Sequence, residues 1–289
     1  MIIGNTLTDI YEKTLKEFKK IKQIQSSQFG DTLEILNYSC CLKNPRARFI
    51  FTKNRKHSLK YLIGELIWYF SGERSIERIS RYSKFWGHIA DEKNEVNSNY
   101  GYKIFSKKIN RKSQYQYVLE ELKRDSLSRR AIMMLNLIDE DYYQMHETKD
   151  FPCTILIQFM IRNNKLHMFV TMRSNDFVYG FCNDVVFFTI LQELFAIRLG
   201  IELGYYYHSS NSEHIYEKHF PLLEFKSAKE KQKEVFPKIS KFDLIYIDKL
   251  VEYEKYIREK KELPITTHEL RCYPEFSRFI INQLYKIWK

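Results

Sequence analysis

Apolar side chains recur every three or four residues in four stretches of the chain, which predicts amphipathic or buried helices. Ser58 is a candidate N-cap for one of them, and Gly72 and Gly200 are candidate stops for two. The spacing predicts helices over 7–24, 59–70, 116–123 and 185–199.

Other stretches alternate apolar and polar residues, or are rich in β-branched and aromatic residues, and these predict strands. The segment 26–32, which contains Gly30, is predicted to be a loop, and Arg162-Asn163-Asn164 is predicted to turn a hairpin. No internal repeat or low-complexity linker divides the chain. We therefore expect a single α+β domain over residues 1–289, built on a mixed sheet. Its predicted strands cover 33–42, 131–137, 154–161, 166–172 and 205–210.

Composition narrows the class of protein. An apolar fraction of 44% with 16% aromatics argues against disorder. No apolar run reaches the roughly 18 residues that span a bilayer, and the first residues do not read as a secretory signal, so no membrane association is expected. Five cysteines, an odd number with Cys40 and Cys41 adjacent, form a poor disulfide framework and indicate the reducing cytoplasm.

The net charge of +11 raises the possibility of nucleic-acid binding. The lysines, however, are spread along the chain, and no nucleic-acid-binding signature is present. We expect small anionic substrates rather than a nucleic acid. Salt-dependent retention on DNA would support the opposite interpretation.

The residues with the clearest chemical potential lie between 151 and 184. Cys153 follows a proline and precedes a predicted strand, and Arg173-Ser174 with Asp176 follow about twenty residues later. A cysteine in this position is either a small buried apolar residue or a nucleophile. Arg129, Arg130 and Arg173 would favour the nucleophile, because a positive field lowers the pKa of a thiol.

This stretch resembles the active-site core of the thymidylate synthase and cytidylate hydroxymethylase family, whose pattern is Pro-Cys followed by Arg-Ser-x-Asp-x-x-x-Gly-x-x-x-Asn. Further segments resemble the family in order: 64–72, 84–86, 99–101, 125–130 and 213–216. The resemblance covers about 25–220, and 221–289 has no recognised counterpart. It implies a homodimer formed through sheet-to-sheet packing.

The resemblance also implies a role for individual side chains. Cys153 is the nucleophile, Glu65 relays protons through water, and Tyr100 assists at C5. The nucleotide is bound by Arg129 and Arg130 reaching across the dimer, and by Arg173, Ser174, Asp184, His214 and Tyr216. The one-carbon donor 5,10-methylenetetrahydrofolate is implied at Trp86, Asp176 and Gly180, and no metal is implied.

Three positions depart from the family pattern. Gln28 stands where a loop arginine binds phosphate, Met172 stands where glutamine precedes Arg-Ser, and Asp184 replaces the final asparagine. An asparagine amide matches the carbonyl and N–H of uracil. A carboxyl accepts from the amino group of cytosine and, when protonated, donates to its N3. Asp184 therefore favours a cytidine nucleotide, unless it only caps the following helix.

The resulting hypothesis is an enzyme that transfers a one-carbon unit to C5 of CMP or dCMP and gives the 5-hydroxymethyl product. One alternative is a thymidylate synthase that methylates dUMP, and Trp86 favours this methylating branch. A second alternative is a nucleotide-binding homologue without turnover. The sequence leaves ribose or deoxyribose open.

Overall fold

The computed structural model describes residues 1–27, 29–53, 55–142, 148–224 and 235–289. Its centre is a sheet with the strand order β1-β3-β10-β8-β7-β6, to which β2 and β9 add at one end. The strands are β1 Ile2–Gly4, β2 Gln25–Ser27, β3 Gly30–Leu42, β6 Ile132–Met134, β7 Thr154–Arg162, β8 Lys165–Met172, β9 Asn175–Asp176 and β10 Glu202–Tyr216, with a separate β4–β5 pair at Lys108–Ile109 and Lys112–Ser113.

The sheet is mixed. Strand β10 runs antiparallel to β3 and parallel to β8, whereas β7 and β8 form an antiparallel hairpin. The hairpin turns at Asn163 and Asn164, which have φ of 52° and 57°. Asparagine tolerates this left-handed conformation, so the predicted turn is confirmed with a physical reason.

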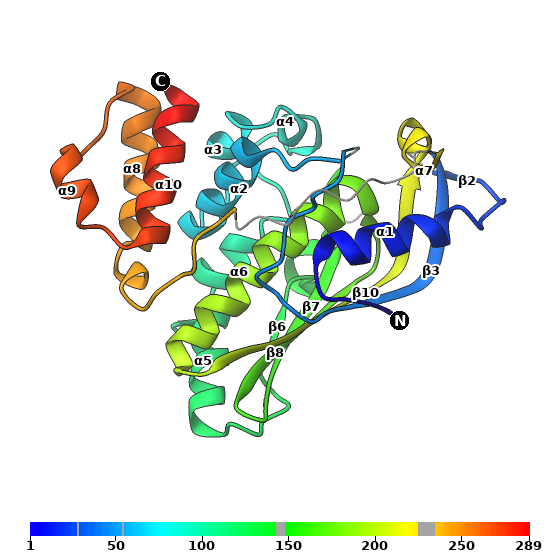
Figure 1. Cartoon of the computed structure of the whole chain (residues 1–289), viewed down its shortest axis with the longest axis horizontal. Helices are drawn as coiled ribbons and strands as arrows, with labels where there is room; N and C mark the ends of the chain where they lie inside the picture. Colours follow the sequence, from blue (N-terminus) through cyan, green and yellow to red (C-terminus); the bar gives the residue numbers. More distant parts are fainter. Residues whose placement is uncertain (28, 54, 143–147, 225–234) are drawn as a thin grey trace.

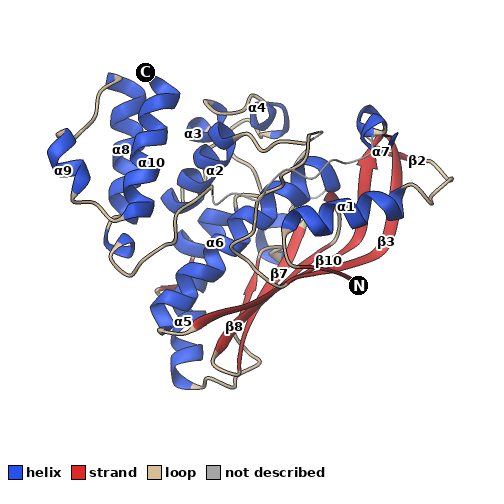
Figure 2. Ribbon diagram, viewed as in Figure 1, coloured by secondary structure: helices blue, strands red, loops and turns tan. Residues whose placement is uncertain are grey.

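Helices cover one face of this sheet (Figures 1 and 2). Helix α6 lies along the centre of that face and α1 lies beside it, while α8 and α10 form an antiparallel pair next to α2. The helices are α1 Leu7–Phe18, α2 Leu59–Ser71, α3 Glu77–Ser80, α4 Phe85–Ile89, α5 Gln114–Arg124, α6 Cys182–Leu199, α7 Pro221–Glu224, α8 Ile247–Lys260, α9 Thr267–Arg271 and α10 Glu275–Trp288.

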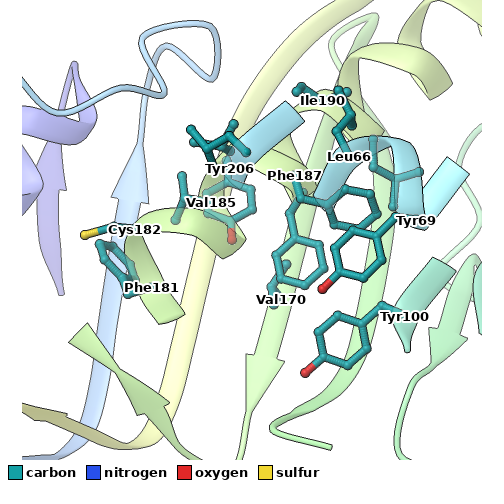
Figure 3. Packing of buried hydrophobic residues seen from close by; sticks show 14 of the residues in the cluster. Leu66, Tyr69, Tyr100, Val170, Phe181, Cys182, Val185, Phe187, Ile190 and Tyr206 are labelled. Atoms are coloured by element: carbon teal, nitrogen blue, oxygen red, sulfur yellow. The ribbon is translucent and has the colours of Figure 1, made fainter. Parts of the chain in front are cut away.

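The core lies between α6 and the helix-covered face of the sheet. Figure 3 shows Tyr206 of β10 and Val170 of β8 close to Val185 and Phe187 of α6, and all four belong to one buried cluster. All four side chains are buried. Burying such side chains contributes about 1.5–3 kcal/mol each. This packing fixes the start of α6, where the candidate site residues lie.

Helix α2 begins at the predicted residue, extends one residue past the predicted end to Ser71 and stops at Gly72 as expected. The Ser58 side chain accepts a hydrogen bond from the Tyr61 N–H, and Gly72 ends the helix with φ of 61°. The glycine within the helix has a packing role, because a Cβ on Gly64 would overlap the ring of Tyr82. The helix therefore approaches α3 and its following turn closely at the residue before Glu65.

Several elements differ in extent from the prediction. Helix α1 ends at Phe18 rather than near 24, and the predicted loop 26–32 contains β2 and the start of β3. Strand β6 is shorter than predicted, whereas β10 continues to Tyr216. The main chain of β10 pairs with β3 from Thr32 to Leu42. This pairing keeps β10 in strand conformation past residue 210, where the sequence pattern of a strand ends. Gln28 lies outside the described residues.

One helical stretch, Phe177–Leu199, is long and apolar enough to cross a membrane. Its apolar window is 78% buried within the fold, as expected of a core helix. The stretch begins in a π-helical turn, Phe177–Phe181, and continues as α6.

Candidate active site

Cys153 lies immediately before β7 and is half-buried. Arg173 holds the chain that precedes it: its Nε donates to the Pro152 carbonyl at 3.0 Å and its Nη2 to the Phe151 carbonyl at 2.8 Å. The Arg173 backbone N–H donates to the Cys153 carbonyl at 2.8 Å. The thiol is therefore fixed at the start of a central strand.

The charge around Cys153 differs from the prediction. Burial raises the pKa of the thiol to about 11, Arg173 lowers it, and Asp150, Asp184 and Asp176 raise it. Three carboxylates and burial outweigh one guanidinium, so the expected lowering of the thiol pKa by arginines is not found within one chain. The approach of a further cation or loss of negative charge would be needed to activate the thiol at neutral pH.

Arg129 and Arg130 lie in the loop between α5 and β6, and both are exposed. Gln158 of β7 donates to the Arg129 carbonyl at 2.8 Å, which ties this loop to the sheet. The two guanidiniums are not among the main charges that act on the pKa of Cys153 in their own chain.

Tyr100 lies beside Cys153. Its hydroxyl accepts a hydrogen bond from the Thr154 N–H at 3.1 Å, and its ring stacks near Tyr69 at 6.0 Å between centroids. Figure 3 shows both tyrosine hydroxyls pointing to the same side. Burial, followed by the charges of Cys153 and Asp184, raises the pKa of Tyr100 well above its ordinary value, so Tyr100 stays a neutral phenol.

Glu65 is buried in α2, with 6% of its surface exposed. The Tyr61 hydroxyl donates to its Oε1 at 2.8 Å and the Tyr69 hydroxyl at 3.5 Å. Burial raises the pKa of Glu65 to about 7, and these two hydrogen bonds lower it. A carboxyl with this pKa can take and return a proton at neutral pH.

Asp184 lies in the first turn of α6 and does not cap it. The N-cap residue is Phe181, which makes no side-chain cap. Burial, then Glu65 and Asp176, raise the pKa of Asp184 well above its ordinary value, while a hydrogen bond from Asn175 lowers it. This shift favours the neutral carboxylic acid form of Asp184. The helix-cap alternative for Asp184 is wrong.

The remaining nucleotide-binding candidates lie on or beside the end of β10. Ser174 Oγ is 3.5 Å from His214 Nδ1, and the rings of His214 and Tyr216 pack edge to face at 5.0 Å. Both residues point to the same side of the strand, since they are two apart. The pKa of Tyr216 is raised by burial and then by Asp176 and Cys153, which places it beside the nucleophile.

The three residues assigned to the folate lie in different environments. Trp86 is buried and packs on Trp68 at 4.9 Å. Asp176 accepts from the Val178 N–H at 3.0 Å and the Tyr179 N–H at 3.3 Å, so its two oxygens begin the π-helical turn. A Cβ at Gly180 would overlap the Asn175 amide, so this glycine makes room for a side chain of the site.

With this geometry established, the relatives decide the family. The thymidylate synthase family model matches residues 6–257. The chain belongs to the thymidylate synthase family. The match extends into α8, well beyond the motif-bearing segment 25–220. The prediction of one domain over 1–289 stays a prediction.

Two curated relatives of this thymidylate synthase family member are phage enzymes. The chain is 34% identical over 202 residues to the deoxycytidylate 5-hydroxymethyltransferase of Enterobacteria phage T4, covering 67% of this chain and 79% of the relative. It is 29% identical over 223 residues to the deoxyuridylate hydroxymethyltransferase of Bacillus phage SP01, covering 74% and 58%.

A cellular relative and a solved structure complete the comparison. The thymidylate synthase of Bacillus mojavensis is 29% identical over 207 residues, covering 69% of this chain and 71% of the relative. The structure of thermostable thymidylate synthase A from Bacillus subtilis matches with a TM-score of 0.65 at 22% identity, covering 84% and 93%. The thymidylate synthase fold and the predicted α+β class are thereby confirmed. The protein is an enzyme of this transferase family, which carries out folate-dependent transfer to C5.

Sequence reasoning missed two residues that contact predicted site residues. Asn175 is 3% exposed and lies 3.2 Å from His208 Nε2, besides its hydrogen bond to Asp184. Tyr61 bonds directly to Glu65. A signal was present for Tyr61, because residues four apart on a helix lie on one face. For Asn175 the contact depends on three elements meeting, which no local pattern encodes.

Proposed function

We propose that this protein transfers a one-carbon unit to C5 of a cytidine nucleotide, CMP or dCMP, and gives the 5-hydroxymethyl product. The observation that carries the proposal is Asp184, a buried carboxyl with a raised pKa where the family pattern has asparagine. A neutral carboxylic acid offers one acceptor and one donor. Cytosine needs that pair at its amino group and N3.

A neutral Asp184 can also pair with the C4 carbonyl and N3–H of uracil, so discrimination against uracil would come from the ionised form. An ionised Asp184 would face the C4 carbonyl of uracil with another acceptor, which costs about 1–3 kcal/mol in a buried site. The similarity to a deoxycytidylate 5-hydroxymethyltransferase supports the choice of cytosine. The similarity to a deoxyuridylate enzyme and to thymidylate synthases keeps dUMP as the second candidate, which Trp86 also favours.

In this proposal Cys153 adds through its thiolate to C6 of the ring. The new S–C6 bond moves the π electron pair onto C5, which makes C5 the nucleophile. Arg173 keeps the thiol in position through the two carbonyls that precede it, and the neutral Tyr100 hydroxyl lies beside the reacting carbons. Glu65 exchanges protons with the ring through water.

We propose 5,10-methylenetetrahydrofolate, the donor used by this family, as the source of the carbon. When bound beside the nucleotide, this donor would supply a methylene group at the oxidation level of formaldehyde. The surroundings fit such a group: the Tyr179 ring is 51% exposed, with Arg55 at 5.4 Å and Lys218 at 6.0 Å from its centroid. An exposed aromatic ring beside cations suits a ligand with aromatic rings and carboxylates. Trp86 and Gly180 would complete this side.

We also propose a homodimer in which Arg129 and Arg130 bind the phosphate held by the partner. Support comes from the open face of the sheet, where Ile132 is 39% exposed, Met134 41% and Tyr205 40%. Phosphate suits paired guanidiniums because each offers a planar fork of donors. The five cysteines are unpaired, which suits the cytoplasm that we propose as the location. We propose no nucleic-acid partner.

One experiment tests the function. The protein is incubated with methylenetetrahydrofolate and, separately, CMP, dCMP, UMP and dUMP, and the products are resolved by mass spectrometry. We expect a hydroxymethyl product from a cytidine nucleotide and little from the uridine nucleotides. A methyl product from dUMP alone would establish thymidylate synthase activity instead. Saturable nucleotide binding without any product would indicate a homologue without turnover.

A further inference from the structure

The two side-chain hydrogen bonds to the Glu65 carboxyl both go to one of its oxygens. Tyr61, one turn before it in α2, and Tyr69, one turn after it, both donate to the same carboxyl oxygen, Oε1. The Tyr61 bond, at 2.8 Å, has ordinary hydrogen-bond length, whereas the Tyr69 contact, at 3.5 Å, is at the limit of one. Among the residues the structure describes, none is hydrogen-bonded to Oε2.

We propose that Tyr61 is a positioning residue for the proton transfers of Glu65: its hydroxyl occupies Oε1, so that Oε2 is the oxygen that takes and returns the proton. The inference rests on the proposed function, in which Glu65 exchanges protons with water. Oε2 takes one proton from a water molecule and later gives one proton back. Tyr61 keeps its own proton throughout.

The state of Tyr61 agrees with this role. Burial and the charge of Glu65 raise its pKa well above the ordinary value, so it is a neutral donor at every pH at which the enzyme would work. The nearby Trp86 of α4 opposes this rise in part. The Tyr61 phenol lies one helical turn from Glu65 and donates to its carboxyl at 2.8 Å, which favours one orientation of the carboxyl.

Other titratable groups facing this pair come from two further elements. The charge of Glu65 raises the pKa of Asp184 on α6, and Asp184 in turn raises the pKa of Tyr61 and of Tyr69. The ring of Tyr100 stacks near that of Tyr69. The tyrosines are neutral near pH 7, because their pKa values are raised well above the ordinary ones, and the raised pKa of Asp184 favours its neutral form. Glu65, with a pKa of about 7, is therefore the group that changes charge there.

The test follows from the direction in which a hydrogen bond shifts an acid. A donor to the carboxylate favours the charged form, so its removal raises the pKa of Glu65. In Tyr61→Phe we expect the acid limb of the kcat–pH profile to move up by about one unit, with about a tenfold loss at acid pH and recovery by pH 9. The matched control, Tyr69→Phe, removes the longer contact and should shift the profile clearly less.

A second measurement does not depend on turnover. The Glu65 carboxyl is titrated by NMR in protein carrying ¹³C-labelled glutamate, with Glu65→Gln used for the assignment. We expect a pKa near 7 in the wild type and a higher value in Tyr61→Phe. A wild-type carboxyl that titrates near 4, or an equal shift in both phenylalanine variants, would overturn the inference. Absence of turnover with every nucleotide would instead overturn the proposed function and leave this titration informative.

Discussion

At the scale of single residues, Asp184 carries the choice of base. Its carboxyl lies in the first turn of α6 without capping it, and burial raises its pKa well above the ordinary value. Replacement by asparagine changes the hydrogen-bonding pattern while nearly keeping the shape. In Asp184→Asn we expect cytidylate activity to fall and uridylate activity to rise, shifting the ratio of kcat/KM by about 10- to 100-fold.

A matched control separates recognition from charge. Asp176→Asn also removes a carboxylate near Cys153, but Asp176 uses both oxygens to hold the π-helical turn. It should lower stability and leave the preference between bases unchanged. Release of tritium from C5-labelled nucleotides measures both variants. A wild type that prefers dUMP would contradict the role given to Asp184.

Cys153 provides a second prediction at this scale. With a thiol pKa of about 11, the free enzyme holds little thiolate at pH 7. Alkylation of the Cys153 peptide by iodoacetamide, followed by mass spectrometry, should therefore accelerate with pH up to at least pH 10. A plateau near pH 7 would show that the thiol is already activated in the free enzyme.

Loss of the thiol itself should abolish turnover. In Cys153→Ser the hydroxyl is far less acidic and cannot readily add to C6. The other cysteine of this stretch, Cys182, is fully buried, and its Sγ contacts the Phe177 carbonyl at 3.2 Å, so it offers no substitute nucleophile. Substantial product from the serine variant would assign the nucleophile to another residue.

At the scale of elements, the parts readable from sequence are those that local chemistry determines. The Ser58 cap, the Gly72 stop and the Asn163-Asn164 turn each depend on the residues themselves. The end of β10, by contrast, does not depend on its own residues alone. It continues to Tyr216 because β3 and β9 pair with it, and this extension places His214 and Tyr216 on the strand.

The site divides in the same way. The family pattern identified Cys153, Glu65 and Asp184 because each lies in a motif of fixed spacing. It could not show the sign of the shift in the thiol pKa, which depends on three carboxylates from separate segments. It also could not show that Asp176 turns towards its own backbone.

The contact of α2 with the turn after α3 gives a prediction about packing. Gly64 precedes Glu65 in α2, and a methyl group on it would overlap the ring of Tyr82. Gly64→Ala should destabilise the fold by about 1–3 kcal/mol, as overpacking does. Gly87→Ala is the control, because nothing lies within 4 Å of its added Cβ. Urea unfolding followed by circular dichroism compares the two, and equal midpoints would contradict the close approach.

At the scale of the whole molecule, the C-terminal helices α8 and α10 contact α3 and the turn after it, on which α2 packs. Glu254 of α8 is fully buried and pairs with Arg78, and Tyr82 donates to it at 2.9 Å. The Trp288 indole of α10 donates to Tyr82 at 3.0 Å. Trp288, which lies beyond the family match, thus helps to hold Tyr82, the residue on which Gly64 of the Glu65 helix packs.

The proposed dimer leads to a test of shared sites. Protein carrying both Arg129→Ala and Arg130→Ala keeps Cys153, whereas Cys153→Ser protein keeps the arginines. If each site draws its arginines from the partner, a mixed dimer contains one intact site. Equal mixing should then restore about a quarter of wild-type activity, since about half of the dimers are hybrids with one intact site each.

The measurement requires proof that subunits exchange, which differently tagged chains and native mass spectrometry provide. The arginine variant alone should be nearly inactive at low nucleotide concentration, because every lost charge-assisted hydrogen bond weakens binding by about 1.5–3 kcal/mol. The Cys153→Ser parent should be inactive because it lacks the nucleophile. The exposed loop that carries both arginines and the open sheet face with Ile132 and Met134 adjoin in sequence, so one surface would serve both purposes. A mixture of proven hybrids that is no more active than its parents would place the two arginines outside the partner's site.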